Sequence, residues 1–207
     1  MFANNGASLD NQPVRQFNAF EDNKHYIGGG SIAVGVTETA VKDADHSQII
    51  IGTGPGISPI VRVFDVATNQ PAYTAIREVK SVRPDVLGGV NVAVGDLTGD
   101  GFNELVIALR NAGQSWVDIY TLAPNKVSDH VAGFQAFGPT EGNNVAVNLV
   151  VRDTDGDGLA EIIVTQGARG KAGFVARKFQ VKSLEAKIVD EIFAEWSNPL
   201  ATGLFIG

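Results

Sequence analysis

The stretch RDTDGDGLAEIIV, which begins at Arg152, concentrates acidic side chains at regular spacing. They stand at positions 1, 3, 5 and 9 of a nine-residue segment: Asp153, Asp155, Asp157 and Glu161. Hard oxygen ligands in this number suit Ca²⁺, and the carbonyl of Leu159 at position 7 would be a further donor. Without a cation, two carboxylates about 4 Å apart repel by about 4 kcal/mol at an effective dielectric constant of 20. The spacing therefore predicts a calcium loop, and the alternative is a solvated acidic turn.

The same pattern occurs 57 residues earlier, in the stretch GDLTGDGFNELVIA. The residues that would bind a second Ca²⁺ there are Asp96, Thr98, Asp100, Phe102 (through its carbonyl) and Glu104. Thr98 stands where Asp155 stands in the other stretch, so this loop offers one carboxylate fewer. A third counterpart, VTETAVKDADHSQ, is longer and lacks the spacing, so Asp43 and Asp45 are predicted to bind weakly or not at all.

Both loops differ from an EF-hand, which needs a glutamate at position 12. Position 12 is Val164 in one stretch and Ile107 in the other. Both residues belong to apolar runs that predict β-strands. The loops are therefore predicted to connect two strands, not two helices.

The stretches that carry the loops are copies of one repeat. VNVAVGDLTGDGFNELVIAL and VNLVVRDTDGDGLAEIIVTQ align without a gap. GGGSIAVG, which ends at Gly35, matches GGVNVAVG, which ends at Gly95, and gives a weaker third copy. RQFNAF (Arg15–Phe20) and AGFQAF (Ala132–Phe137) repeat as well. Self-similarity of this period indicates one supersecondary unit that stacks on its copies.

Each unit is predicted to contain four short strands. In the second unit they fall near Val90–Gly95, Glu104–Leu109, Trp116–Leu122 and Val131–Phe137. The first of these alternates apolar and other residues with the period of a strand, and LVIAL is apolar throughout, as expected of a strand covered on both faces. Four antiparallel strands in about 50–60 residues are typical of a β-propeller blade. The predicted fold class is all-β, built of propeller blades.

The order of the repeats predicts three full units and parts of two others. The predicted boundaries are 1–30 for an N-terminal segment with an outer strand, 31–87, 88–143 and 144–200 for the repeats, and 201–207 for the first strand of a further or shared unit. The last segment, TGLFIG, matches VNVAVG. Because propellers usually contain four or more blades, we expect a piece of a longer propeller. Alternatively, the two ends join in one sheet, or another chain completes it.

The composition excludes several classes of protein. The chain has 207 residues, a formal net charge of −7, 44% hydrophobic residues and no cysteine. No basic run is present, so nucleic acid is not an expected partner. Disulfides and thiolate zinc sites are excluded, and no apolar run approaches the about 20 residues of a membrane span. MFANNGASLD lacks a signal-peptide pattern, which favours an excised segment with a start methionine over a non-secreted protein.

The two acidic loop stretches and the stretch that begins at Gly52 resemble the FG-GAP/VCBS-type repeats of integrin α-subunit propellers and bacterial surface proteins. The resemblance rests on GDLTGDGFNELVIA, RDTDGDGLAEIIVT and GTGPGISPIVRVFD, and it covers about 180 residues. It implies an extracellular propeller, usually seven-bladed, that acts in adhesion or ligand binding or as a scaffold, with the acidic loop residues as calcium ligands. The chain departs from the family because it has too few units for such a ring and lacks the FG-GAP tripeptides.

No catalytic constellation is evident. GTGPG lacks the G-x-G-x-x-G spacing and precedes a strand, so it predicts a hairpin turn and not a phosphate loop. No G-x-S-x-G occurs, and His25, His46 and His130 lie in linker-like positions without metal-ligand spacing. Trp116 and Trp196 are predicted to be core residues, with sugar stacking as the alternative.

The predicted function is a calcium-binding, non-enzymatic, extracellular module for adhesion, ligand binding or surface assembly. Its partner would be a protein or glycan on a cell or matrix surface, with neither nucleic-acid binding nor direct membrane insertion. One alternative is a propeller module of a secreted carbohydrate-active enzyme, with carboxylates as acid and base. Another is a subunit that assembles into rings or filaments through its incomplete units. No feature of the sequence identifies the ligand.

Overall fold

A computed structural model describes residues 16–23, 25–37, 47–65, 75–110, 115–122, 129–139, 146–167, 175–182 and 185–193. The described residues form twelve β-strands of six to nine residues, and every pair is antiparallel. The all-β prediction is thereby confirmed. The predictions for Asp43, Asp45, His46, Trp196 and the segment Thr202–Gly207 lie outside the described residues.

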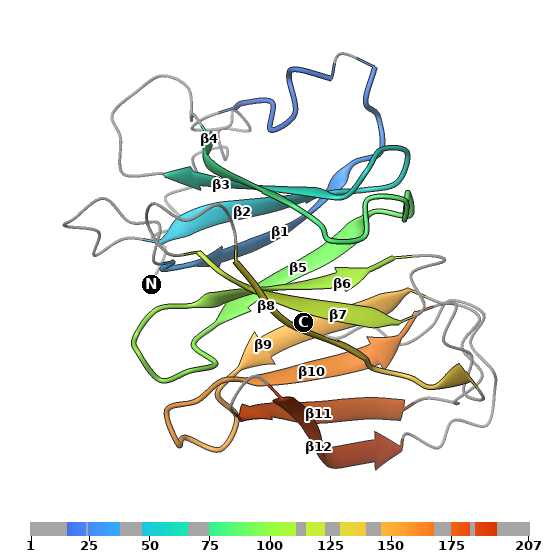
Figure 1. The fold of residues 1–207 in the computed structure, drawn as a ribbon. Helices are drawn as coiled ribbons and strands as arrows, with labels where there is room; N and C mark the ends of the chain where they lie inside the picture. The colour runs from blue at the N-terminus through green and yellow to red at the C-terminus, as the bar shows by residue number, and fades with distance from the viewer. Residues whose placement is uncertain are drawn as a thin grey trace, which may run out of the picture.

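The strands form three four-stranded sheets that follow one another along the chain (Figure 1). The first sheet contains β1 (Gly30–Gly35), β2 (Gln48–Thr53), β3 (Ile60–Asp65) and β4 (Ala75–Lys80). The second contains β5 (Val90–Gly95), β6 (Glu104–Leu109), β7 (Trp116–Thr121) and β8 (Asp129–Gln135). The third contains β9 (Val147–Arg152), β10 (Glu161–Gln166), β11 (Val175–Lys182) and β12 (Glu185–Phe193). In each sheet the spatial order of the strands is their order in the sequence.

The four strands predicted for the second unit are present, with different bounds for two of them. β5 and β6 have the predicted bounds, and β7 ends one residue early, at Thr121. The prediction for β8 is two residues late, because the strand begins at Asp129 and ends at Gln135. β8 is the last strand of its sheet, and an edge strand accepts polar residues such as Asp129 and His130 that hide its start in the sequence.

The sheets pack face to face through two hydrophobic cores. One core joins the first and second sheets and contains Ile50, Val61 and Leu105, and the other joins the second and third sheets and contains Val106, Ile162 and Phe179. β6 lies between them, and all six of its residues are buried. This confirms that its apolar run is covered on both faces.

The glycines that end β1 and β5 allow a close approach to the next first strand. A Cβ atom on Gly95, the last residue of β5, would lie 2.4 Å from Cγ1 of Val151 in β9. A Cβ atom on Gly35, the last residue of β1, would lie 2.6 Å from Cγ2 of Val94 in β5. The same glycine–valine contact thus occurs between the first and second sheets and between the second and third, and no larger residue fits there without a shift.

An arginine joins the outer part of the third sheet to the second. Arg177 of β11 donates a hydrogen bond of 2.7 Å from Nη1 to the carbonyl of Ala136, and its guanidinium lies 5.0 Å from the ring centre of Phe137. The side chains of Phe134 and Phe179 pack beside it, with ring centres 4.6 Å apart.

The first sheet has the same contact with the segment before it. Arg62 of β3 donates a hydrogen bond of 2.9 Å to the carbonyl of Ala19 and lies 5.2 Å from the ring centre of Phe20. Phe17 and Phe64 lie 5.0 Å apart. Residues 17–20 therefore occupy on the first sheet the place that residues 134–137 occupy on the third.

Within the described ranges the three sheets do not close into a ring. Those ranges also contain no helix with the length and apolar character that crossing a membrane requires.

Candidate metal centre

The predicted calcium loop is the connection between β9 and β10. Arg152 and Glu161 face each other at the end of this antiparallel pair, so residues 153–160 form a hairpin loop. Val164 lies inside β10, and Ile107 lies inside β6. The loops thus connect strands, as predicted, and no helix follows either of them.

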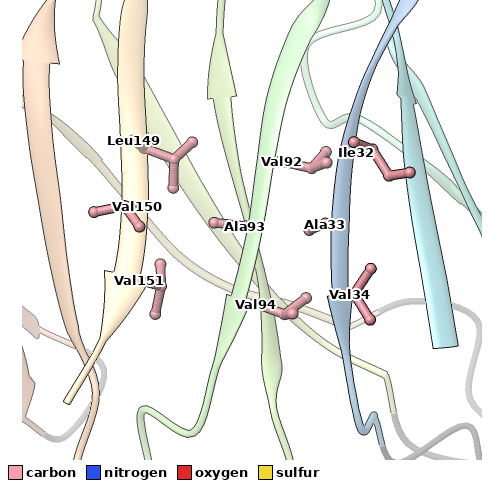
Figure 2. A pocket seen from close by; sticks show the side chains of 9 residues that line it. All are labelled: Ile32, Ala33, Val34, Val92, Ala93, Val94, Leu149, Val150 and Val151. Carbon is pink, nitrogen blue, oxygen red and sulfur yellow. The ribbon is translucent and has the colours of Figure 1, made fainter. Parts of the chain in front are cut away.

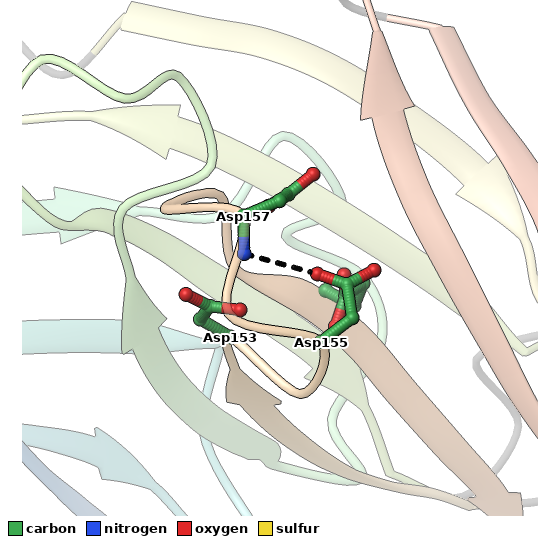
Figure 3. A group of neighbouring side chains, drawn as sticks. Asp153, Asp155 and Asp157 are labelled. Atoms are coloured by element: carbon green, nitrogen blue, oxygen red, sulfur yellow. Dashed lines mark hydrogen bonds between the residues drawn. The ribbon is translucent and has the colours of Figure 1, made fainter.

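The four carboxylates of this loop converge. One oxygen from each of the four side chains lies within 4.8 Å of the others: Asp153, Asp155, Asp157 and Glu161. Figure 3 shows the three aspartates around the bend of the loop, with the amide of Asp157 donating a hydrogen bond of 3.2 Å to Oδ1 of Asp155. A cation that coordinates these four oxygens would relieve the mutual repulsion of the carboxylates.

The loop is wrapped around the carboxylate of Asp153. Its Oδ1 accepts a hydrogen bond of 2.7 Å from the amide of Gly156, and its Oδ2 accepts one of 3.0 Å from the amide of Gly158. These amides lower the pKa of Asp153, because they stabilise the ionised form. Gly156 and Gly158 have φ angles of 80° and 88°, in the left-handed region that glycine adopts most readily.

Glu161 supplies the buried wall of the loop. Only 1% of the residue is exposed, and its Oε2 accepts hydrogen bonds from the amide of Thr154 at 3.0 Å and from the hydroxyl of Thr154. Its Oε1 is buried and has no hydrogen-bond partner. A buried oxygen of a carboxylate without a partner costs free energy, and a bound cation would remove that cost.

Two polar groups from β11 approach the loop from outside. Nζ of Lys178 lies 3.4 Å from Oγ1 of Thr154, and Nε2 of Gln180 lies 3.4 Å from Oδ2 of Asp157. Neither reaches Oε1 of Glu161. The positive charge of Lys178 offsets part of the negative charge at the rim, Gln180 donates a hydrogen bond there, and the buried oxygen of Glu161 stays unsatisfied.

The corresponding loop between β5 and β6 is arranged differently. Oδ1 of Asp96 accepts amide hydrogen bonds from Gly99 at 2.6 Å and from Thr98 and Asp100 at 3.2 Å, and its Oδ2 accepts one from Gly101 at 2.8 Å. In the described part of the chain only the loop at residues 153–161 gathers three or more possible metal-binding side chains, so Asp96, Asp100 and Glu104 do not converge in the same way. The side chain of Phe102, whose carbonyl is a predicted ligand, is 39% exposed.

Glu104 is the buried carboxylate of this first loop. It is 5% exposed, and its Oε2 accepts a hydrogen bond of 2.8 Å from the amide of Leu97. Burial raises the pKa of Glu104 to about 7, the Leu97 amide opposes that rise, and the charges of Asp100 and Asp96 add to it. At neutral pH a proton therefore competes with any cation for this side chain.

Sequence reasoning missed the residues that hold the buried glutamates. Leu97 and Thr154 occupy the same repeat position, and each donates its amide to the glutamate seven residues later. A backbone donor leaves no signature in the side chains. It also missed Arg62 and Arg177, although the shared FNAF and FQAF stretches mark the carbonyls that these arginines bind.

The prediction that His130 lies in a linker is wrong. His130 belongs to β8, and its Nε2 lies 3.0 Å from Oδ1 of Asp118, which is fully buried in β7. Arg83 binds the same carboxylate through Nε at 3.1 Å and stacks on Trp116 at 3.6 Å from the ring centre. Trp116 also packs against the core between the first and second sheets, in agreement with its prediction as a core residue.

A shallow groove runs along the first strands of the three sheets (Figure 2). Nine apolar side chains line it: Ile32, Ala33, Val34, Val92, Ala93, Val94, Leu149, Val150 and Val151. The groove therefore offers van der Waals contact and no acid, base or nucleophile from its lining side chains.

No protein-family model matches the chain, and no curated protein matches it.

Proposed function

We propose that the chain is a calcium-stabilised, non-enzymatic segment of a β-propeller that serves as an extracellular binding or assembly module. The observation that carries the calcium part is the buried, unpartnered Oε1 of Glu161 beside three converging aspartates. The solvated acidic turn accounts for the exposed Asp155 and Asp157, but not for a buried carboxylate oxygen without a donor.

The propeller part is supported by the repetition of contacts from sheet to sheet. The same glycine–valine approach joins β1 to β5 and β5 to β9. The same arginine–carbonyl bond joins β3 to residue 19 and β11 to residue 136. Units that repeat their contacts with neighbours are the construction principle of propellers, and the FG-GAP/VCBS resemblance of the loops agrees with it.

Thermal unfolding of the chain in EDTA and in Ca²⁺ tests the calcium part. Calcium sites of extracellular modules bind at about 10⁻⁴–10⁻³ M, and a concentration ten times Kd stabilises by about 1.4 kcal/mol. For a chain of this size we expect the Tm in millimolar Ca²⁺ to rise by roughly 3–6 °C. Mg²⁺ should raise it less, because Mg²⁺ retains several waters. Equal Tm values in EDTA and in Ca²⁺ would remove calcium from the proposal.

The non-enzymatic part rests on the sequence, in which no catalytic motif is evident. A turnover screen against polysaccharides is the matching experiment. Hydrolysis that scales with the amount of chain, and that survives removal of traces of other enzymes, would favour the carbohydrate-active alternative.

Self-association is a second candidate, favoured by the uncovered face of the first sheet. Ile32 and Val34 of β1 are 65% and 61% exposed, whereas Val92 and Val151 at matching positions of β5 and β9 are 7% and 8% exposed. The first sheet covers Val92, and the second sheet covers Val151. The occupant that we propose for the uncovered face is the third sheet of a second copy of this chain.

Sedimentation equilibrium from micromolar to millimolar concentration tests this candidate. In such a dimer β9 of one copy would contact β1 of the other, and β9 ends in Arg152 where β1 and β5 end in glycine. The larger side chain hinders a close approach, so association should be weak. The mass should rise above 21.8 kDa with concentration, and the pair Ile32→Lys and Val34→Lys should abolish the rise. Leu87→Lys, at another exposed apolar residue, serves as the control. A wild-type chain that stays at 21.8 kDa throughout would eliminate the candidate.

A further inference from the structure

The loop at residues 153–161 is hydrogen-bonded to the corresponding loop of the second sheet. The amide of Ala160 donates a hydrogen bond of 2.7 Å to the backbone carbonyl of Asp96. The preceding pair of sheets has the same bond, from the amide of Asn103 to the carbonyl of Val36 at 3.0 Å. In both cases the donor is position 8 of a loop and the acceptor is position 1 of the loop before it, so the bond is part of the repeat.

Side chains reinforce this contact. Ala160 is 6% exposed and belongs to the core between the second and third sheets. A Cβ atom on Gly99 would lie 2.8 Å from Cδ2 of Leu159, so the Leu159 side chain lies directly against the first loop. The end of the loop is thus fixed on the second sheet, whereas Asp155 and Asp157 are exposed.

One peptide group faces both the cation loop and the neighbouring sheet. The peptide between Leu159 and Ala160 is trans, like all the others described, so its C=O and N–H point in opposite directions. Because the N–H points at Asp96, the Leu159 carbonyl points away from the second sheet. That carbonyl is the position-7 ligand predicted from the sequence.

We propose that a cation in the loop at residues 153–161 tightens the packing of the third sheet on the second, through the peptide group between Leu159 and Ala160. This inference rests on the proposed function, because it requires the loop to bind Ca²⁺. The cation ties the exposed aspartates to Glu161, whose neighbour Ala160 is bonded to Asp96. A cation at the Leu159 carbonyl also polarises the peptide group and strengthens its N–H as a donor, since linked polar interactions reinforce one another.

Amide hydrogen exchange of the full chain, followed by NMR in EDTA and in saturating Ca²⁺, tests the inference. The amides of Gly156 and Gly158 report on the loop itself, because both bind Asp153. The amide of Ala160 reports on the contact between the sheets. We expect Ca²⁺ to slow exchange at all three, by at least about tenfold at Ala160. Slower exchange at the glycines with no change at Ala160 would overturn the inference and leave the proposed function intact. No change at any of the three would overturn both.

A variant that weakens Ca²⁺ binding without changing the charge of the loop separates the effect of the bound cation from that of the loop charge. Gly158→Ala strains the loop, because an alanine at a φ of 88° is disfavoured, and the new Cβ would meet nothing within 4 Å. At a Ca²⁺ concentration near the wild-type Kd, the slowing at Ala160 should fall by at least about threefold. Gly56→Ala is the matched control, since Gly56 also has a positive φ and open space but lies in the β2–β3 turn of the first sheet.

Asp155→Asn gives a second route if the glycine variant folds poorly. The asparagine oxygen still accepts the amide hydrogen bond of Asp157, so the turn is kept while one ligand charge is lost. The slowing of amide exchange at Ala160 by Ca²⁺ should therefore be smaller than in the wild type. An effect that persists unchanged in both loop variants, or that disappears equally in Gly56→Ala, would overturn the inference.

Discussion

The guanidinium of Arg177 is hydrogen-bonded to the backbone carbonyl of Ala136 at 2.7 Å, and this bond crosses from the third sheet to the second. Ala136 is 1% exposed, so few other donors can reach its carbonyl. The equivalent bond from Arg62 to Ala19 fixes residues 16–20 on the first sheet. Residues 17–20, which form no strand, thereby take on the first sheet the place that the residues at the end of β8 take on the third.

Arg177→Ala should lower the free energy of unfolding by about 1–3 kcal/mol. The Ala136 carbonyl loses a charged donor, and an unsatisfied buried acceptor carries a cost of that size. Urea unfolding followed by circular dichroism measures it as a lower midpoint. Arg152→Ala is the control, because Arg152 is exposed. Equal midpoints for the two variants would mean that the Arg177 bond contributes nothing.

Glu161→Gln should have opposite effects with and without calcium. In EDTA it removes one of four converging carboxylates, so stability should rise by on the order of 1 kcal/mol. The glutamine oxygen can still accept from the Thr154 amide. In Ca²⁺ the variant loses a ligand, so the Tm gain of the wild type should disappear. Thermal unfolding of both chains in both buffers gives four Tm values, and a variant that keeps the full calcium gain would contradict the assignment of Glu161.

The contribution of Glu104 to stability in EDTA should fall as the pH rises from about 4.5 to about 7. In this window folded Glu104 holds a proton that the unfolded chain has lost, because its pKa is raised from 4.5 to about 7. The folded state therefore binds more protons, and the free energy of unfolding decreases with pH, by no more than about 3 kcal/mol from this group. Glu104→Gln should be flatter over the same window. Parallel pH profiles for variant and wild type would exclude Glu104 as the source.

Gly95→Ala should destabilise the chain by about 1–3 kcal/mol through overpacking. Its Cβ would lie 2.4 Å from Cγ1 of Val151 and 3.0 Å from Cβ of Ala160. Val151→Ala removes the closer atom, so the double variant should be more stable than the sum of the single effects predicts. A double-mutant cycle from urea unfolding should give a coupling of about 1 kcal/mol or more. Additive effects would show that the two sheets move apart freely at this point.

The strands could be predicted from the sequence because their patterns are local. Val90 and Val92 of β5 are buried with the half-buried Asn91 between them, and the apolar run of β6 is buried throughout, so both patterns follow from which faces a strand buries. The acidic spacing of the loop at residues 153–161 likewise predicted side chains that the structure brings within 4.8 Å of one another. Features that depend on residue spacing within one hairpin could therefore be predicted from the sequence.

Contacts between sheets could not be predicted from the sequence, because they depend on residues far apart in the chain. Asp118 takes the place in β7 that Arg62 and Arg177 hold in β3 and β11, and Arg83 supplies the positive charge from the neighbouring segment instead. Arg62 forms an ion pair of 2.8 Å with Asp22, so the pair of Asp118 with Arg83 exchanges the positions of the acidic and basic partners. Nothing in the isolated stretch WVDIYT announces that Asp118 is fully buried.

Equal spacing of the acids did not give equal geometry in the two loops. Asp96 and Asp153 occupy the same position, and glycine amides bind both carboxylates. Thr98 stands in place of Asp155, so the first loop has one acidic side chain fewer, and its acids do not gather as those of the second loop do. The two nine-residue loops differ at four positions, so the shared acidic spacing alone does not determine which oxygens meet.

Small and large residues lie at opposite ends of the contact between the second and third sheets. Gly95 of β5 approaches Val151 of β9 at the first strands, whereas the rings of Phe134 and Phe179 pack with their centres 4.6 Å apart toward the outer strands. Residue size that grows from the first strands outward favours an angle between two sheets over parallel stacking. Exchanging the sizes of these residues should therefore change the angle between the second and third sheets.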